Sequence, residues 1–297
     1  MCHGSTKCLE LDTMNDTNND RNHDIDDVDI DDVLTRTEDG VGVVTLNRPK
    51  LANAQDLVLL RHLDACLTAM AENSEVKVIL LNANGKHFSA GHDMNPKRDE
   101  LLRFHPEGPH GLADLYAIER EVYIGFCQKW RNIPKPTIAA VQGACIAAGL
   151  MLAWPCDLII ASDTAYFSDP VVNMGIGGVE YHCHAWEFGH RKAKELLFTS
   201  DRLSAEEARQ LGMVNRVVPA DQLQKEALEL AKKVATKPAF GLQMAKRAVN
   251  QAMDIGGQEA AQKAIFDIHS VGHGHALSIS GIPVLVDLEA MKESNRQ

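Results

Sequence analysis

Two stretches of small residues in this sequence could bring backbone amides to a substrate. Residues 88–93 read Phe-Ser-Ala-Gly-His-Asp, and residues 143–149 read Gly-Ala-Cys-Ile-Ala-Ala-Gly. Small residues let a ligand approach the main chain, and amides at the start of a helix donate readily to anions. Two amides from separate loops could meet at one thioester oxygen and stabilise an enolate. Alanine and glycine runs also mark tight helix packing, so the pattern alone leaves both interpretations open.

The elements around these stretches predict where they lie. A β-branched run predicts a strand at 41–46, helical spacing of apolar residues predicts a helix over 56–72, and a second strand is predicted over 76–82. Strand, helix and strand in this order indicate a βαβ unit. Further strands are predicted at 137–141, 157–161 and 165–167. Both small-residue stretches directly follow strands, which is where α/β sheets bind ligands.

The chain becomes mainly helical after Arg191. Helices are predicted over 191–200, 204–212, 222–234, 238–252 and 257–270, with one short strand at 214–218. Ser204 followed by Glu207 has the spacing of a capping box. The predicted fold class is therefore α/β, with a helical C-terminal part.

The negative charge of the chain is concentrated at its N-terminus. The 297 residues have a formal net charge of −11, of which residues 1–32 contribute −8. This tail is rich in Asn and Asp and poor in apolar residues, which predicts disorder. The rest of the chain is close to neutral, and we expect no nucleic-acid partner.

The cysteines and the apolar segments indicate the cellular compartment of the protein. The seven cysteines are scattered and form no CxxC pair, which is typical of reduced thiols. The N-terminus has no signal pattern, and no apolar stretch is long enough to span a membrane. We therefore expect a cytoplasmic protein.

Several motifs in order resemble one known family. Residues 46–50 read Leu-Asn-Arg-Pro-Lys, residues 88–93 have the Ser-Ala-Gly motif, and residues 135–143 read Lys-Pro-Thr-Ile-Ala-Ala-Val-Gln-Gly. Cys156-Asp157 and the segment 206–218, EEARQLGMVNRVV, complete the likeness. Over nearly all of residues 36–270 the sequence resembles the crotonase (enoyl-CoA hydratase/isomerase) superfamily.

The resemblance implies a fold, a chemistry and an assembly. The fold is a crotonase-type spiral of ββα repeats, whose C-terminal helices mediate homotrimers, often paired into hexamers. We therefore expect a tail at 1–34, a core with the acyl-CoA site at 35–215 and a helical oligomerisation region at 216–297. The substrate is an acyl-CoA thioester, and no cofactor or metal is implied beyond its coenzyme A.

The resemblance also implies site residues. Ala90, in the Ser-Ala-Gly motif, and Ala148, at the middle of the usual glycine triplet, donate the two oxyanion amides. The residues expected to line the bound coenzyme A and acyl group are Arg48, Lys50, Ala52, Ser89, Gly91, His92, Asp93, Met94, Gly149, Met151 and Val171. Arg48 and Lys50 could meet phosphates, or they could be solvated surface charges.

The sequence departs from the family where a hydratase needs its two glutamates. One carboxylate activates water while the other manages the second proton. The corresponding positions are Met151 and Val171, and neither side chain transfers protons. Hydration by the usual pair is therefore excluded unless other groups replace it.

Three side chains are candidates for that replacement. Glu180 follows the glycine-containing segment 175–178 and is the sharpest of them, although it could equally be an exposed acid. Asp169 precedes a proline, as turn residues often do, and His92 could be a spectator at the rim of the cleft. The histidines at 182, 184, 269, 273 and 275 suggest a metal, but packing or spectator roles are favoured.

Two classes of function follow. The leading hypothesis is a lyase or isomerase of enoyl-CoA type in fatty acid metabolism, with Glu180 as acid and base. The competing hypothesis is a non-catalytic acyl-CoA binding protein that has lost the glutamates. Thioester hydrolysis, decarboxylation and dehalogenation stay open, because one oxyanion hole serves all of these reactions.

Overall fold

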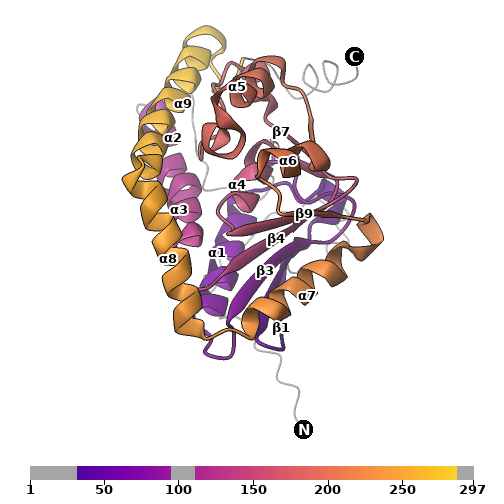
Figure 1. The fold of residues 1–297 in the computed structure, drawn as a ribbon. Helices are drawn as coiled ribbons and strands as arrows, with labels where there is room; N and C mark the ends of the chain where they lie inside the picture. Colours follow the sequence, from indigo (N-terminus) through magenta and orange to yellow (C-terminus); the bar gives the residue numbers. More distant parts are fainter. Residues whose placement is uncertain (1–31, 95–110, 286–297) are drawn as a thin grey trace, which may run out of the picture. The chain divides into compact units, whose positions relative to one another are not determined.

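Six strands form the main sheet, in the order β1-β2-β3-β4-β6-β9 (Figure 1). The computed structural model describes residues 32–94 and 111–285, so the expected tail lies outside the described residues up to position 31. The strands of this sheet are β1 (Val33–Glu38), β2 (Val41–Leu46), β3 (Val78–Ala83), β4 (Thr137–Val141), β6 (Leu158–Ser162) and β9 (Arg216–Val218). All neighbours are parallel except β1 and β2.

A second, smaller sheet and a series of helices complete the described chain. The small sheet has the order β5-β7-β8, with β5 (Ala144–Ile146), β7 (Tyr166–Ser168) and β8 (Leu203–Ser204). The α-helices are α1 (Leu57–Glu72), α2 (Gly111–Ile118), α3 (Gly125–Arg131), α4 (Leu150–Ala153), α5 (His184–Thr199), α6 (Ala205–Leu211), α7 (Leu223–Ala235), α8 (Ala239–Ile255) and α9 (Gln258–Ser280). Short helical turns are η1 (Pro49–Leu51), η3 (Ala147–Gly149), η4 (Pro170–Met174) and η5 (Ala220–Gln222), and η2 (Glu119–Ile124) is a π-helix.

The chain passes from the main sheet to the small sheet before each of the helices α4 and α5. From β4 it passes to β5 in the small sheet and then to α4, and from β6 it passes to β7 and then through η4 to α5. This is the ββα repeat that was expected. The predicted α/β class with a helical C-terminal part is confirmed.

The main sheet is buried on both faces, which its alternating side chains explain. Val44 and Leu46 of β2 pack in the cluster that includes α1, whereas Val41 and Val43 pack in the cluster that includes α7. Successive side chains of a strand point to opposite faces, so one apolar run can serve two layers. Figure 1 shows α1 and α7 on opposite sides of β3 and β4.

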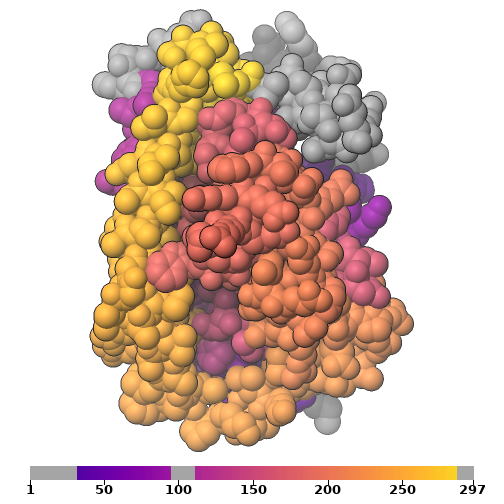
Figure 2. All heavy atoms as spheres, turned by 45° about the horizontal axis from the view of Figure 1, so that its top comes forward, coloured from indigo at the N-terminus to yellow at the C-terminus, as the bar shows by residue number. Residues whose placement is uncertain are grey.

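The C-terminal helices divide into two groups. Strand β9 pairs with β6, and α7 buries Leu223, Ala227 and Ala231 against the main sheet. Beyond them, α8 and α9 run along α3 and α2 (Figure 1), and Figure 2 shows both on the surface beside α5. The expected division of the chain at 34 and 215 stays a prediction, although Val33 already begins β1.

Two local features of the helices stand out. The helical segment from α2 to α3 is interrupted by the π-helix η2, a rare form often found at functional sites. Ser204 does cap α6, because its Oγ accepts from the Glu207 amide at 3.2 Å. The Glu207 carboxylate instead lies 2.7 Å from Lys192 Nζ, so α6 is tied to α5.

Two further features of the described residues concern membranes and thiols. Within 32–94 and 111–285, no helix combines the length and the apolar character needed to cross a membrane. The described cysteines, at 66, 127, 145, 156 and 183, are all free thiols, as expected.

Truncation of Leu63 tests the layer beneath α1. Leu63 is fully buried, so Leu63→Ala should lower the free energy of unfolding by about 2–5 kcal/mol through lost burial and a cavity. Val58→Ala on the same helix is the matched control, because Val58 is 42% exposed. Its cost should stay within about 0.5 kcal/mol. Urea denaturation followed by circular dichroism measures both, and equal costs would contradict this packing.

Candidate active site

The two small-residue stretches lie side by side. The Ser89 amide donates to the Ala144 carbonyl, and the Ile146 amide donates to the Ser89 carbonyl, both at 3.1 Å. Ser89 and Cys145 thereby form a parallel bridge. Because these segments leave the neighbouring strands β3 and β4 at the same edge, the sheet itself brings them together.

A buried glutamine fixes the distance between the two stretches. Gln55 Nε2 donates to Ser89 Oγ at 3.0 Å and to the Ala148 carbonyl at 2.9 Å. Ser89 Oγ in turn donates to the Asn53 carbonyl at 2.9 Å. The Ser89 hydroxyl therefore holds the two stretches together, and its contact with a substrate stays a prediction. Sequence reasoning missed Gln55, because nothing in its local pattern marks a polar residue that bridges two loops.

Two glycines allow the backbones to approach one another. Gly91 has φ +95°, and a Cβ there would lie 3.0 Å from the Ile146 carbonyl oxygen and 3.3 Å from the Ala148 nitrogen. A Cβ on Gly149 would lie 2.6 Å from the Ser89 carbonyl oxygen. Only glycine fits these contacts. Both positions, which were expected to line the substrate, therefore need glycine for a steric reason.

The pair of available amides differs from the one expected. The Ala90 amide already donates to the Ala52 carbonyl at 3.0 Å, so it cannot donate to a substrate in this structure. Among the described residues, the amide of His92 has no acceptor. Ala148 is the second residue of η3, where amides have no acceptor within the helix. This contact argues against Ala90 as an oxyanion donor and leaves the amide of His92 available in the same stretch, while the expected role of Ala148 stays a prediction.

Glu180 is buried beside this amide pair. Its side chain is 5% exposed, and its Oε1 lies 3.1 Å from Nε2 of His92 and 3.8 Å from Nε2 of His269. Burial by itself would raise the pKa of the carboxyl, but the two imidazoles outweigh burial and hold that pKa well below its usual range. Glu180 is thus an ionised carboxylate at neutral pH and can accept a proton.

The main chain of Met151 contacts a buried thiol of α3. The Cys127 thiol donates to the Met151 carbonyl at 3.3 Å. Burial raises the pKa of that thiol, and the charges of Cys183 and Glu180 raise it further.

Asp169 is a structural residue rather than a proton-transfer group. Its Oδ2 accepts from the Val179 amide at 2.8 Å and lies 2.9 Å from Nε2 of His184. Both side chains are almost fully buried. Asp169 holds the segment before Glu180 in place, so it supports that residue and does not replace it.

Arg48 is also engaged within the protein. Its guanidinium lies 3.2 Å from both Asp56 and Asp93, and it donates to the Ala54 carbonyl at 2.6 Å. Only 10% of its side chain is exposed. Arg48 is therefore not a solvated surface charge. Its guanidinium is occupied by these partners and does not present a free pair of N–H donors to a phosphate. Asp93 shares this structural role.

The other expected contact residues are placed as follows. Lys50 is exposed on η1, and Ala52 caps η1 with φ +51°. Met94 is 45% exposed at the end of the first described range. Met151 is buried in α4, and Val171 is half-buried in η4. Their contacts with coenzyme A stay predictions.

A second cluster of titratable side chains lies next to Glu180. His273 Nε2 is 3.2 Å from Glu119 Oε1 and 2.9 Å from His269 Nε2, and all three residues are buried. Burial lowers the pKa of His273, but Glu119 outweighs burial and raises it. These histidines were expected to be spectators, yet they contact each other and two carboxylates.

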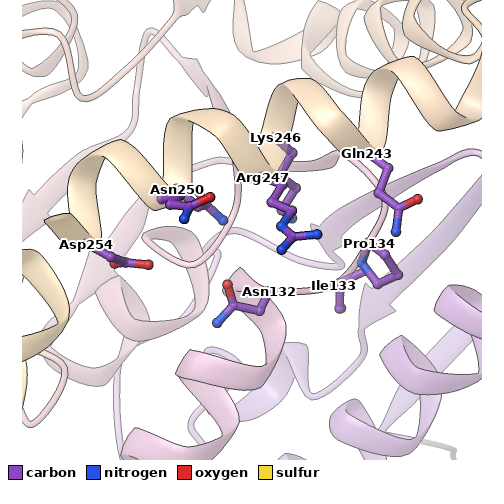
Figure 3. A pocket seen from close by; sticks show the side chains of 9 residues that line it. Asn132, Ile133, Pro134, Gln243, Lys246, Arg247, Asn250 and Asp254 are labelled. Carbon is purple, nitrogen blue, oxygen red and sulfur yellow. The ribbon is translucent and has the colours of Figure 1, made fainter.

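A cavity of about 340 Å³ opens elsewhere, between α8 and residues 132–134. Figure 3 shows Lys246, Arg247 and Asn250 of α8 on one side and Asn132 and Pro134 on the other. Lys246 is paired with Asp157 at 2.9 Å. None of the candidate catalytic residues lines this cavity, so its size does not mark it as the active site.

The fold of ββα repeats and the two adjoining small-residue stretches are the features on which the family assignment can be checked. The family model of enoyl-CoA hydratase/isomerase matches residues 36–273. The chain therefore belongs to the enoyl-CoA hydratase/isomerase family, as the sequence motifs predicted, and it is an enzyme of that type.

Individual relatives agree with this assignment. EchA13 of Mycobacterium tuberculosis, one of several relatives named as enoyl-CoA hydratases, is 40% identical over 259 residues, which are 82% of this chain and 81% of that protein. The crystal structure of a probable enoyl-CoA hydratase from Mycobacterium smegmatis has 55% identity and a TM-score of 0.81, covering 87% of this chain and all of the other. An enoyl-CoA hydratase/isomerase from Xanthobacter autotrophicus Py2 has 31% identity and a TM-score of 0.73, covering 84% and 94%.

The contact between Gly149 and Ser89 can be tested with one methyl group. Gly149→Ala places a Cβ against the Ser89 carbonyl, and the resulting backbone shift should cost about 1–3 kcal/mol of stability. It should also abolish turnover of acyl-CoA esters, because it displaces Ala148. Gly241→Ala is the control, since a Cβ there meets nothing within 4 Å. Calorimetry and a turnover assay measure both effects, and a fully active Gly149→Ala enzyme would contradict the geometry.

Proposed function

We propose that this protein binds an unsaturated acyl-CoA thioester and shifts its double bond through an enolate. The amides of His92 and Ala148 donate to the thioester oxygen, and Glu180 moves the proton. The observation that supports this most directly concerns His92. Its main chain belongs to the first oxyanion stretch, while its ring lies 3.1 Å from the Glu180 carboxylate.

The proposed reaction needs only one group that carries a proton. Glu180 removes a proton from a carbon next to the double bond, and the electron pair moves through the conjugated system to the thioester oxygen. Amides that donate to this oxygen stabilise the charge as it develops. The same carboxyl then returns the proton at another carbon, which gives the isomeric enoyl ester with atoms and charge balanced.

Hydration is the second candidate, because the relatives named above are called enoyl-CoA hydratases. It requires a second group to handle a proton of the attacking water. With Met and Val at positions 151 and 171, His92 is the nearest titratable side chain to Glu180 that is partly open to solvent, with 23% of it exposed. A double-bond shift needs only one proton-transfer group, whereas hydration needs two.

The assembly and location follow the family expectation. We propose a homotrimer, with or without pairing to a hexamer, in the cytoplasm. Helix α8 buries none of its residues within the chain, and it exposes Phe240, Val249 and Ile255 by 64–81%. An apolar helix face of this kind suits a contact with another copy. Beyond the coenzyme A of the substrate, we propose no cofactor for the enolate chemistry.

Replacing Glu180 tests the assignment. Glu180→Gln retains shape but cannot accept a proton, so turnover of 3-enoyl-CoA to the conjugated 2-enoyl ester should fall by at least about 100-fold. Binding of a saturated acyl-CoA should change much less. The gain in absorbance of the conjugated thioester measures turnover, and calorimetric titration measures binding.

The control for this change is Glu229→Gln on α7, where the glutamate is 58% exposed and turnover should be unaffected. Crotonyl-CoA and longer 2-enoyl-CoA and dienoyl-CoA esters are assayed alongside. Conversion of crotonyl-CoA to a hydrated product would favour hydration. A wild-type protein that binds acyl-CoA but converts none of these esters would be a non-catalytic binder, and activity surviving in Glu180→Gln would remove Glu180 from the mechanism.

A further inference from the structure

The cluster of Glu119, His269 and His273 does not belong to the proposed proton transfer, and its geometry is unusual for spectators. Glu119 begins the π-helix η2, whereas both histidines lie on α9, four residues apart and hence on one face of that helix. One ligand atom from each residue can be chosen so that all three lie within 4.8 Å of one another. The cluster joins two elements that are far apart in the sequence.

The hydrogen bonds of the two rings determine which nitrogens carry protons. His269 Nδ1 lies 2.8 Å from the Gly178 carbonyl oxygen, and His273 Nδ1 lies 2.6 Å from the Pro283 carbonyl oxygen. A carbonyl oxygen only accepts, so both Nδ1 atoms must donate. In the neutral imidazoles, both Nε2 atoms then present lone pairs.

These two lone pairs face one another at 2.9 Å. Such an arrangement is repulsive unless the two nitrogens share something positive, either a proton or a metal cation. A proton on His273 Nε2 can serve His269 Nε2 and Glu119 Oε1. It leaves Oε2 of the buried Glu119 with no hydrogen-bond partner among the described residues, 3.7 Å from His269 Nε2.

A cation between the three residues satisfies every one of these atoms. It accepts both Nε2 lone pairs and the Glu119 carboxylate, and its charge offsets that carboxylate and the neighbouring Glu180. Histidine ligands characteristically donate Nδ1–H to a carbonyl or carboxylate while Nε2 binds the metal. Both rings have that arrangement here.

We propose that Glu119, His269 and His273 form a binding site for one divalent transition-metal cation, with zinc as the best match. Two imidazoles and one carboxylate are a ligand set that zinc accepts, whereas calcium and magnesium prefer oxygen ligands throughout. Separations of 2.9, 3.2 and 3.7 Å between the ligand atoms suit bonds of about 2.0–2.1 Å to one ion. The proposal is independent of the proposed function, because metal binding can be measured without turnover.

The site would be structural in its effect. The cation would hold α9 against η2, and through His269 it would fix the Gly178 carbonyl two residues before Glu180. Tyr123, on the same π-helix, stacks on His92 at 4.2 Å between ring centroids. The metal would therefore brace the two segments that flank the proposed base.

Metal content of the full-length chain tests the proposal directly. Protein stripped with a chelator and then reloaded should bind about one zinc ion per chain. Cobalt(II) in its place should give the visible absorption of a mixed nitrogen and oxygen site. His273→Gln and Glu119→Gln should each weaken zinc binding at least about 10-fold in competition with a chromophoric chelator.

The matched control is His275→Gln, because His275 is an exposed histidine on the same helix, and zinc binding should be unchanged. Zinc held elsewhere on the chain would be the same in all variants. Glu119→Gln is nearly isosteric, so far-UV circular dichroism should confirm its fold even if His273→Gln fails to fold. If wild type binds zinc no more tightly than Glu119→Gln, the proposal is wrong and the rings share a proton.

Discussion

The hydrogen bonds of the Gln55 side chain are the constraint on which the rest of the site depends. A single buried amide group connects the Ser89 hydroxyl of one stretch with the Ala148 carbonyl of the other. Each such bond contributes only about 0.5–1.5 kcal/mol, but leaving its partners buried and unpaired costs about 1–3 kcal/mol each. Separation of the two stretches is therefore strongly disfavoured, and the amides that follow them keep a fixed spacing.

The carboxylate side of the site is built differently. Glu180 lies in a loop, with no helix or strand to orient it, so neighbouring contacts must do so. Asp169 accepts from the Val179 amide, and His269 donates to the Gly178 carbonyl, so the two residues before Glu180 are both held. A loop held at two successive residues can present the carboxylate that follows them reproducibly. In the proposed mechanism, this is how a base is supplied from outside positions 151 and 171.

The sequence predicted the parts of the molecule that follow from local pattern. Strand β2, helix α1 and the strand at 137–141 were predicted almost to the residue, because their apolar periodicity is strong. The motif likeness led to Ala148 and Glu180. It also led to Ala90, whose amide is not free. That amide donates to the carbonyl of Ala52, which lies 38 positions away in the sequence. Gln55 and the pairing of Arg48 with Asp56 and Asp93 likewise depend on contacts that no local pattern encodes.

The difference between the two halves of the site has a consequence for the family. The oxyanion amides depend on residues 52–55, 88–92 and 144–149, which the fold keeps together in any chain with these motifs. The position of Glu180 depends on α9, which approaches the loop so closely that a Cβ on Gly272 would lie 3.1 Å from the Gly175 carbonyl oxygen. In the proposed mechanism, α9 therefore influences where the base lies, which the motifs that identify the family do not determine.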